Sequence, residues 1–139
     1  MKKTKLINSE VSYLVADLGH KDSLVIGDAG LPVPEGVRKI DLAVSKGVPD
    51  FLSVFSAILS EQRVEAAVMA AEIKEKSPRL HERILEILAE EEKASASKIN
   101  VSYVPHEEFK ARTEDCRGAV RTGEFTPYAN IILVSGVVF

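Results

Sequence analysis

Apolar residues recur at helical spacing in three segments of the chain. In the first, apolar residues at i, i+3, i+4, i+7 and i+8 follow Asp50, whose side chain can cap the first turn, so a helix is predicted over 51–59. A second helix is predicted over 78–93, opened by a proline, with apolar residues facing inward and glutamates outward. A third is expected over 9–19, with Ser9 as its N-cap.

Short apolar runs bounded by turn residues predict strands between these helices. Some runs are continuous, which is typical of a strand buried on both faces, and others alternate with polar residues. Helices and strands therefore alternate, and the predicted class is α/β: a single domain, 1–139, with a mixed, largely parallel sheet and helices packed on it. The predicted strands cover 23–26, 39–44, 99–103, 118–120 and 131–139.

Two segments leave alternatives open. The alanines of 64–73 favour a helix, but its uninterrupted apolar run suits a central strand, which we prefer. The apolar run 131–139 continues to the carboxyl terminus, where most domains fray. Either the domain's own core or a neighbouring subunit must cover it, and the sequence does not choose between them.

Composition narrows the function classes. The 139 residues are 45% hydrophobic and 28% charged, which is ordinary for a globular domain. Lys and Arg total 18 against 21 Asp and Glu, a net charge of -3, so no excess positive charge is present to bind nucleic acid. No apolar stretch approaches the roughly 20 residues of a membrane helix, and no secretion signal is visible. We expect a soluble, cytoplasmic protein without nucleic-acid or membrane partners.

Motifs for common chemistries are missing. There is no glycine-rich phosphate loop, no paired CxxC, no HExxH and no GxSxG, so kinase, dehydrogenase and metalloprotease interpretations lose their support. The lone Cys116 can neither form an internal disulfide nor complete a thiolate metal cage, and it receives no role. His81 lies beside Glu82 on the predicted helix 78–93 and is interpreted as structural. No metal or cofactor is expected.

His20 and Asp28 flank a predicted strand. His20 follows Gly19 in the loop that leads into the strand 23–26, and Asp28 lies in the turn Gly-Asp-Ala-Gly after it. Ligands of open α/β sheets collect at the carboxyl ends of strands, so we expect His20 beside Asp28, as a proton donor or acceptor near neutral pH. The alternatives are a histidine that caps the helix before it and an aspartate that stabilises its own turn.

Two further segments offer sugar-binding groups. His106 follows Pro105 at the start of a predicted short helix. The alternative to a sugar-binding role is that it is a helix-capping residue without a specific function. The loop 126–130 presents the phenol of Tyr128 and the amide of Asn130 just before a buried strand. Such groups suit sugar hydroxyls, which need donors, acceptors and a flat apolar face.

Together these residues resemble the D-ribose pyranase family of bacterial ribose-utilisation proteins. The matching motifs extend over essentially the whole chain in the same order, and by this resemblance 64–73 is a strand. Near the amino terminus the motifs are Asn8-Ser9, Leu18-Gly19-His20-Lys21-Asp22 and Asp28-Ala29-Gly30-Leu31-Pro32-Val33-Pro34. Further along they are Val64-Glu65-Ala66-Ala67, His106-Glu107-Glu108-Phe109 and Arg121-Thr122-Gly123-Glu124-Phe125-Thr126-Pro127-Tyr128-Ala129-Asn130.

The resemblance implies a cofactor-free isomerase that interconverts the pyranose and furanose forms of D-ribose, chiefly the β-anomers, so that a ribokinase receives furanose. It also implies a ring-shaped homodecamer of two pentamers, with active sites near subunit interfaces. By motif position His20 is the expected general acid/base. The expected sugar-binding residues are Asp28, His106, Tyr128, Ala129 and Asn130.

Two alternative functions remain. The related fucose mutarotase group shares a Gly-His-x-Asp loop, but it tends to carry histidine and phenylalanine at the positions of Gly30 and Leu31. It also tends to carry Tyr-Gly-Asn where this chain has 128–130, so the differences favour the pyranase. A non-catalytic sugar-binding or regulatory subunit could use the same polar pocket, because residues that bind hydroxyls look alike in binders and in enzymes.

Overall fold

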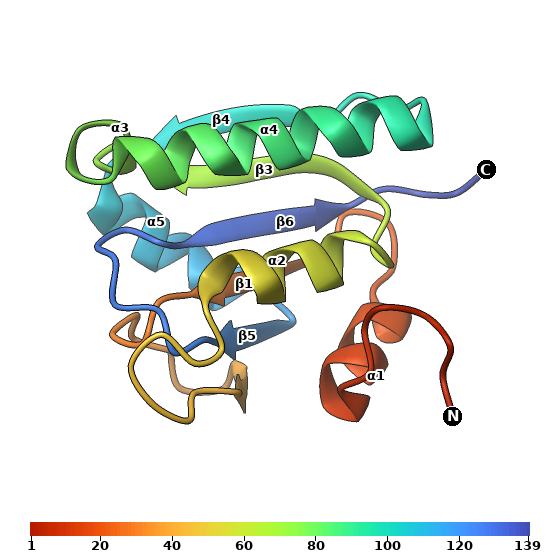
Figure 1. The fold of residues 1–139 in the computed structure, drawn as a ribbon, viewed down its shortest axis with the longest axis horizontal. Coiled ribbons are helices and arrows are strands. Elements are labelled where there is room, and N and C mark those ends of the chain that lie inside the picture. Colours follow the sequence, from red (N-terminus) through yellow and green to blue (C-terminus); the bar gives the residue numbers. More distant parts are fainter.

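The computed structural model describes residues 1–139 as one sheet with helices on both faces (Figure 1). The α/β class predicted from the alternating pattern is confirmed. In chain order the elements are α1 (Ser9–Asp17), β1 (Ser23–Gly27), β2 (Arg38–Asp41), α2 (Phe51–Leu59), β3 (Val64–Ala70), α3 (Ile73–Lys76), α4 (Pro78–Ser95), β4 (Asn100–Val104), α5 (His106–Arg112), the 3-10 helix η1 (Thr113–Asp115), β5 (Gly118–Arg121) and β6 (Ile131–Ser135).

The six strands lie in the order β2-β5-β1-β6-β3-β4. Neighbouring strands are parallel except at β6, which runs antiparallel to both β1 and β3. Five strands therefore point the same way, and their carboxyl ends lie together with the amino end of β6. We call this side the carboxyl edge and the opposite side the amino edge; in Figure 1 the arrows of β3 and β5 point toward the carboxyl edge.

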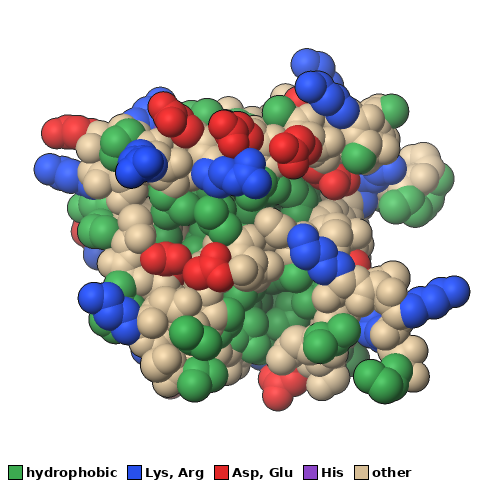
Figure 2. Space-filling model, in the orientation of Figure 1, with side chains coloured by type: hydrophobic (Ala, Val, Ile, Leu, Met, Phe, Trp, Pro, Cys, Tyr) green, Lys and Arg blue, Asp and Glu red, His purple; other side chains and the backbone are tan.

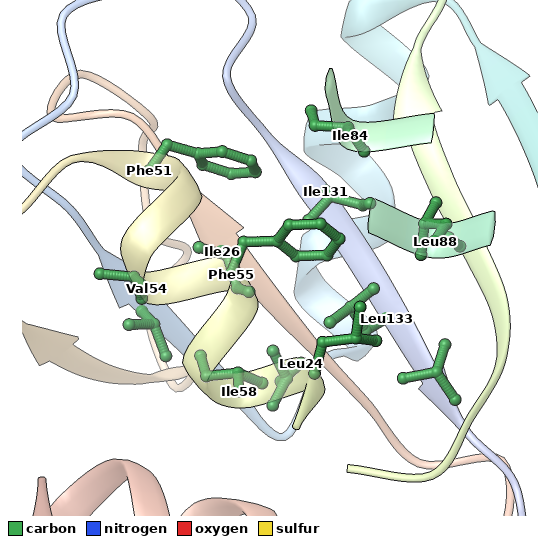
Figure 3. Close-up of a cluster of buried hydrophobic side chains, with 14 of the residues drawn as sticks. Leu24, Ile26, Phe51, Val54, Phe55, Ile58, Ile84, Leu88, Ile131 and Leu133 are labelled. Carbon is green, nitrogen blue, oxygen red and sulfur yellow. The ribbon is translucent and has the colours of Figure 1, made fainter. Parts of the chain in front are cut away.

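Alternating side chains of the strands fill a core on each face of the sheet. On one face Leu24 and Ile26 of β1 pack with α2 and α4, where Phe51 and Phe55 stack with ring centroids 5.8 Å apart (Figure 3). On the other face Val25 belongs to a smaller cluster beneath α5 and η1. Because β1 is buried on both faces, its continuous apolar sequence is explained.

The helix boundaries follow local capping chemistry. Helix α2 begins after Asp50, whose carboxylate accepts the N–H of Ser53 at 3.1 Å, as predicted. Helix α4 begins at Pro78, also as predicted, and extends to Ser95. The N-cap of α1 is Asn8 rather than the predicted Ser9, because the Asn8 side chain reaches the N–H of Val11 at 2.9 Å.

Two strands are shorter than predicted, and a third segment divides. β2 covers only 38–41, because the chain turns out of the sheet where Asp41 accepts the N–H of Ala43. The segment 64–73 is a strand as far as Ala70, after which Ile73 begins α3.

At the carboxyl terminus, β6 ends at Ser135 instead of continuing to the last residue. The N–H of Gly136 bonds to Arg63 instead, and the segment 137–139 leaves the sheet with Phe139 fully exposed. Nothing within the chain covers this apolar end.

The surface is charged over the helices and hollowed beside the carboxyl terminus. Figure 2 shows Lys, Arg, Asp and Glu side chains interspersed along the band over α4, with hydrophobic side chains in the groove beneath it. No helix combines the length and the apolar character that crossing a bilayer requires.

Candidate active site at the carboxyl edge

Asp28 and Asn130 form a reciprocal pair at the carboxyl edge. Asp28 directly follows β1, and Asn130 directly precedes its antiparallel neighbour β6. The N–H of Asp28 donates to Asn130 Oδ1 at 2.9 Å, and Asn130 Nδ2 donates to Asp28 Oδ2 at 3.0 Å. Gly27 permits this approach, since a Cβ there would lie 3.2 Å from Asn130 Oδ1 and 2.6 Å from Leu31. The pair fixes the orientation of both side chains.

The Asp28 carboxylate is half-buried, and it caps its own turn by accepting the N–H of Gly30 at 2.9 Å. Burial raises the pKa of Asp28, although the hydrogen bonds from Gly30 and Asn130 and the nearby charge of His106 oppose this rise. Turn formation and ligand binding are therefore compatible here. The carboxylate is held rigidly and keeps acceptor positions for a ligand.

His106 and Tyr128 bring two rings to the same edge. The His106 ring meets the Tyr128 ring edge-on, with centroids 5.0 Å apart and planes at 89°, and stacks over Phe109 at 6.4 Å. The main-chain N–H of His106 donates to both carboxylate oxygens of Glu72 at 3.1 Å. Its Nδ1, however, is buried without a hydrogen-bond partner. Since buried polar atoms are nearly always paired, this nitrogen needs a partner that the protein itself does not supply, such as a water or a ligand hydroxyl.

The loop 122–130 shapes the site. Tyr128 has a φ of 61°, a left-handed conformation that non-glycine residues adopt rarely and that recurs at functional sites. Glu124 holds the loop by accepting the N–H of Phe51 at 3.1 Å and the hydroxyl of Thr126 at 2.8 Å. Burial opposes its ionisation, but these donors keep the pKa of Glu124 below its ordinary value. The Ala129 side chain is fully buried in the core, so only its main chain could meet a ligand.

Arg121 is a residue of this edge that the sequence reasoning did not assign. Its Nε donates to the carbonyl of Ala29 at 2.9 Å, and its NH1 pairs with Asp41 at 3.0 Å. It thereby ties the turn after Asp28 to β2, and it lines a cleft of about 390 Å³ together with Asp28. Arg121 is the last residue of β5, and ligands of open α/β sheets bind beyond the carboxyl ends of strands. This position could have indicated that Arg121 belongs to the site.

His20 does not join these residues within one chain. It precedes β1, whereas Asp28 follows it, so the five residues of β1 separate the two by roughly 16 Å. His20 lies at the amino edge, where its Nε2 is 3.0 Å from Glu65 Oε2 and its side chain is 51% exposed. The expectation that His20 lies beside Asp28 is therefore wrong for a single chain. The rule that ligands collect at carboxyl ends applies to residues that follow a strand.

His81 and Cys116 lie away from the Asp28–Asn130 pair. His81 Nε2 is 2.6 Å from the Tyr103 hydroxyl, so this contact joins α4 to β4. Burial, together with the charge of Lys74, lowers the pKa of His81, and burial raises that of the Cys116 thiol. The chain contains no cluster of three or more His, Cys, Asp or Glu side chains that could hold a metal ion.

Comparisons with known proteins identify the family of the chain. A family model described as "RbsD / FucU transport protein family" matches residues 1–138. A D-ribose pyranase of Vibrio parahaemolyticus is 54% identical, and one of Histophilus somni is 52% identical. Each alignment covers 100% of both chains.

Two solved structures share the fold over the whole of both chains. Bacillus subtilis RbsD complexed with D-ribose has a TM-score of 0.88 at 44% identity. The fucose mutarotase of Streptococcus pneumoniae in complex with L-fucose has a TM-score of 0.82 at 21% identity, which supports the fold alone. From the family match and the full-length relatives, we conclude that this chain belongs to the RbsD / FucU family.

Proposed function

We propose that this protein is a D-ribose pyranase. It interconverts β-D-ribopyranose and β-D-ribofuranose, and thereby supplies the furanose form for phosphorylation by a ribokinase. Relatives that carry this name align with the chain from end to end at about half identity, and the ribose complex of B. subtilis RbsD has the same fold. No cofactor is needed, because ring opening requires only proton transfers.

The observation that carries the proposal is the group of polar atoms at the carboxyl edge. The Asp28 carboxylate is fixed by Asn130, and the unpaired Nδ1 of His106 is buried against the Tyr128 ring. Acceptors of fixed orientation beside an aromatic ring are what a monosaccharide requires. In the proposal Asp28, His106, Tyr128 and Asn130 bind hydroxyls through their side chains. Ala129 contributes through its main chain.

Ring opening requires a proton at the ring oxygen and the loss of one from the anomeric hydroxyl. We assign the ring-oxygen proton to His20, while water or a base at the site takes the anomeric proton. Acid/base groups held in position typically contribute about 10²- to 10⁴-fold, which suffices for a reaction that already proceeds in water. The fixed hydroxyl contacts let the open chain rotate and reclose without leaving.

His20 must then come from a second copy of the chain. Each chain carries His20 at its amino edge and Asp28 at its carboxyl edge, so head-to-tail association would bring the two together. Both edges also expose apolar side chains: Val44, Val48 and Phe125 at the carboxyl edge and the segment 137–139 at the amino edge. Heterologous contacts of this kind form a ring when the rotation between successive copies closes. The family resemblance suggests two pentameric rings, a homodecamer, in the cytoplasm where the kinase acts.

The test is proton NMR of D-ribose at equilibrium, with a trace of protein added. Magnetisation exchange between the β-pyranose and β-furanose signals should accelerate with the wild-type protein and with a His81→Ala control. The same exchange should return to the uncatalysed rate with His20→Ala. An unchanged exchange rate with the wild-type protein would refute the proposal, and acceleration for L-fucose alone would favour a mutarotase. Stoichiometric binding without acceleration would indicate a sugar-binding subunit.

A further inference from the structure

The ring of His20 is held by a carboxylate that no part of the proposed mechanism uses. Glu65 lies near the start of β3 at the amino edge, and its Oε2 is 3.0 Å from His20 Nε2. Its other oxygen, Oε1, pairs with the ammonium group of Lys21. One carboxylate therefore contacts two consecutive side chains of the loop before β1.

Three features of the backbone accompany the contact between Glu65 and this loop. The pairing of β3 with β6 shifts register between Val64 and Ala66, which flank Glu65, and irregularities of this kind re-aim side chains. Gly136 leaves room beside it, because a Cβ there would lie 3.2 Å from Glu65 Cβ and 3.4 Å from Oε2. Lys21 has a φ of 72°, a left-handed conformation that is unusual for a lysine.

The main chain around His20 is also fixed. The N–H of Lys21 donates to the carbonyl of Ser135 at 2.9 Å, and the N–H of Ser135 donates to the carbonyl of Asp22 at 2.8 Å. Asp22 in turn accepts the N–H of Gly19 through its side chain at 2.9 Å. With the backbone fixed on both sides of His20, the remaining freedom is rotation of its side chain, and Glu65 restrains that rotation.

Glu65 is also ionised at neutral pH. The hydrogen bond from Lys21 lowers the pKa of Glu65, against a smaller opposing effect of burial, and His20 lowers it further. A carboxylate that accepts a hydrogen bond from one ring nitrogen determines which nitrogen is left to exchange a proton with a substrate.

We propose that Glu65 is a positioning residue for His20, an inference that rests on the proposed function. Glu65 accepts the Nε2–H, so Nδ1 is the atom that faces the sugar. When the ring opens, the proton on Nδ1 of the imidazolium passes to the ring oxygen, which leaves the neutral Nε2–H ring. When the sugar recloses, the hydroxyl that attacks the carbonyl carbon returns its proton to Nδ1, and the water or base that took the anomeric proton returns it to the carbonyl oxygen. The negative charge of Glu65 stabilises the imidazolium at each turnover.

The test compares Glu65→Gln with Glu61→Gln, a matched control. Glu61 lines the same cleft as His20 but pairs with Lys2 at 2.8 Å and does not contact the ring. We expect Glu65→Gln to lower kcat about tenfold with KM within about twofold, as for partners that orient metal-bound imidazoles. Gly136→Ala, which crowds the Glu65 carboxylate without altering its chemistry, should lower kcat by a smaller factor. Glu61→Gln should match the wild-type protein.

A spectroscopic readout tests the contact independently of activity. The two ring nitrogens of His20 should give ¹⁵N shifts of a single Nε2–H tautomer in the wild-type protein and in Glu61→Gln. In Glu65→Ala both shifts should move toward the average of the two tautomers. Wild-type kcat in Glu65→Gln, or unchanged ¹⁵N shifts in Glu65→Ala, would overturn the inference while leaving the proposed function intact. Absence of ribose exchange in the wild-type protein would overturn both.

Discussion

Replacing Asn130 by aspartate tests the reciprocal pair on which the site depends. Asn130 is almost completely buried, and its Nδ2 donates to Asp28 Oδ2 at 3.0 Å. Asn130→Asp removes this donor and places a second carboxylate against the first. At an effective dielectric constant of about 20, two unit charges at this separation repel by about 5 kcal/mol. Solvent around the half-exposed Asp28 reduces this repulsion to about 2–3 kcal/mol, and the lost hydrogen bond adds about 1 kcal/mol.

The destabilisation caused by Asn130→Asp should increase with pH. Two facing carboxylates share a proton, so the folded-state pKa of one lies above its unfolded value. Stability is then retained below the unfolded pKa of about 4 and is lost as pH rises through the folded pKa. Holding that proton at pH 5 costs only about 1.4 kcal/mol, one pH unit above the unfolded pKa, and the shared proton restores a hydrogen bond between the two side chains. We therefore expect Asn130→Asp to cost about 3–4 kcal/mol at pH 8 and about 1–2 kcal/mol at pH 5.

The assay is urea unfolding followed by circular dichroism at pH 5 and pH 8, at one protein concentration because an oligomer's stability depends on it. Asn100→Asp is the matched control, since Asn100 is an exposed residue at the start of β4 and should shift the free energy of unfolding by less than about 0.5 kcal/mol. If Asn130→Asp behaves like this control, or costs the same at both pH values, then the Asp28–Asn130 pair does not hold the site as described.

Three further predictions concern the loops and the buried thiol. Gly123→Ala places a Cβ 2.4 Å from the carbonyl oxygen of Val48, so it should lower the free energy of unfolding by about 1–3 kcal/mol. Thermal unfolding would measure this loss, with Gly19→Ala as the control. The lowered pKa of Glu124 contributes stability that is present above its unfolded pKa and lost as pH falls through the folded one. The wild-type protein should therefore lose more stability than Glu124→Gln between about pH 5 and pH 3 in urea titrations, and equal losses would remove the role given to its hydrogen bond from Phe51. Burial raises the pKa of the Cys116 thiol, so a disulfide reagent should label it in urea but only slowly in the folded protein, and rapid labelling of the native protein would contradict its burial.

The sequence could predict the elements whose local chemistry is unambiguous. Helix α2 follows from Asp50 and the apolar spacing after it, and β1 follows from a continuous apolar run closed by glycine. The α1 cap could not be decided in the same way, because Asn8 and Ser9 both carry side chains suited to capping. The end of β6 could not be predicted either, because Val137 is as apolar as the strand before it. The strand ends at Ser135 because no residue of β3 pairs with the chain beyond that point.

The site depends on contacts between strands that are distant in sequence. Asp28 and Asn130 meet because β1 and β6 are neighbours, and neither periodicity nor composition reports that order. The same is true of Glu65, whose interaction with His20 depends on the register shift in β3. The misplacement of His20 has a different origin. His20 and Asp28 are only eight positions apart in sequence, but the extended strand β1 lies between them and places them at opposite edges of the sheet.

In the proposed assembly, each active site combines His20 of one copy with the carboxyl edge of another. Its most direct test is complementation between His20→Ala and Asp28→Ala, each inactive alone, refolded together in equal amounts. In randomly mixed rings about one quarter of the interfaces join an intact His20 to an intact Asp28, because each is contributed with a probability of one half. If the sites are shared between copies, the mixture should show about a quarter of wild-type ribose exchange. Exchange no faster than that of either variant alone would contradict it.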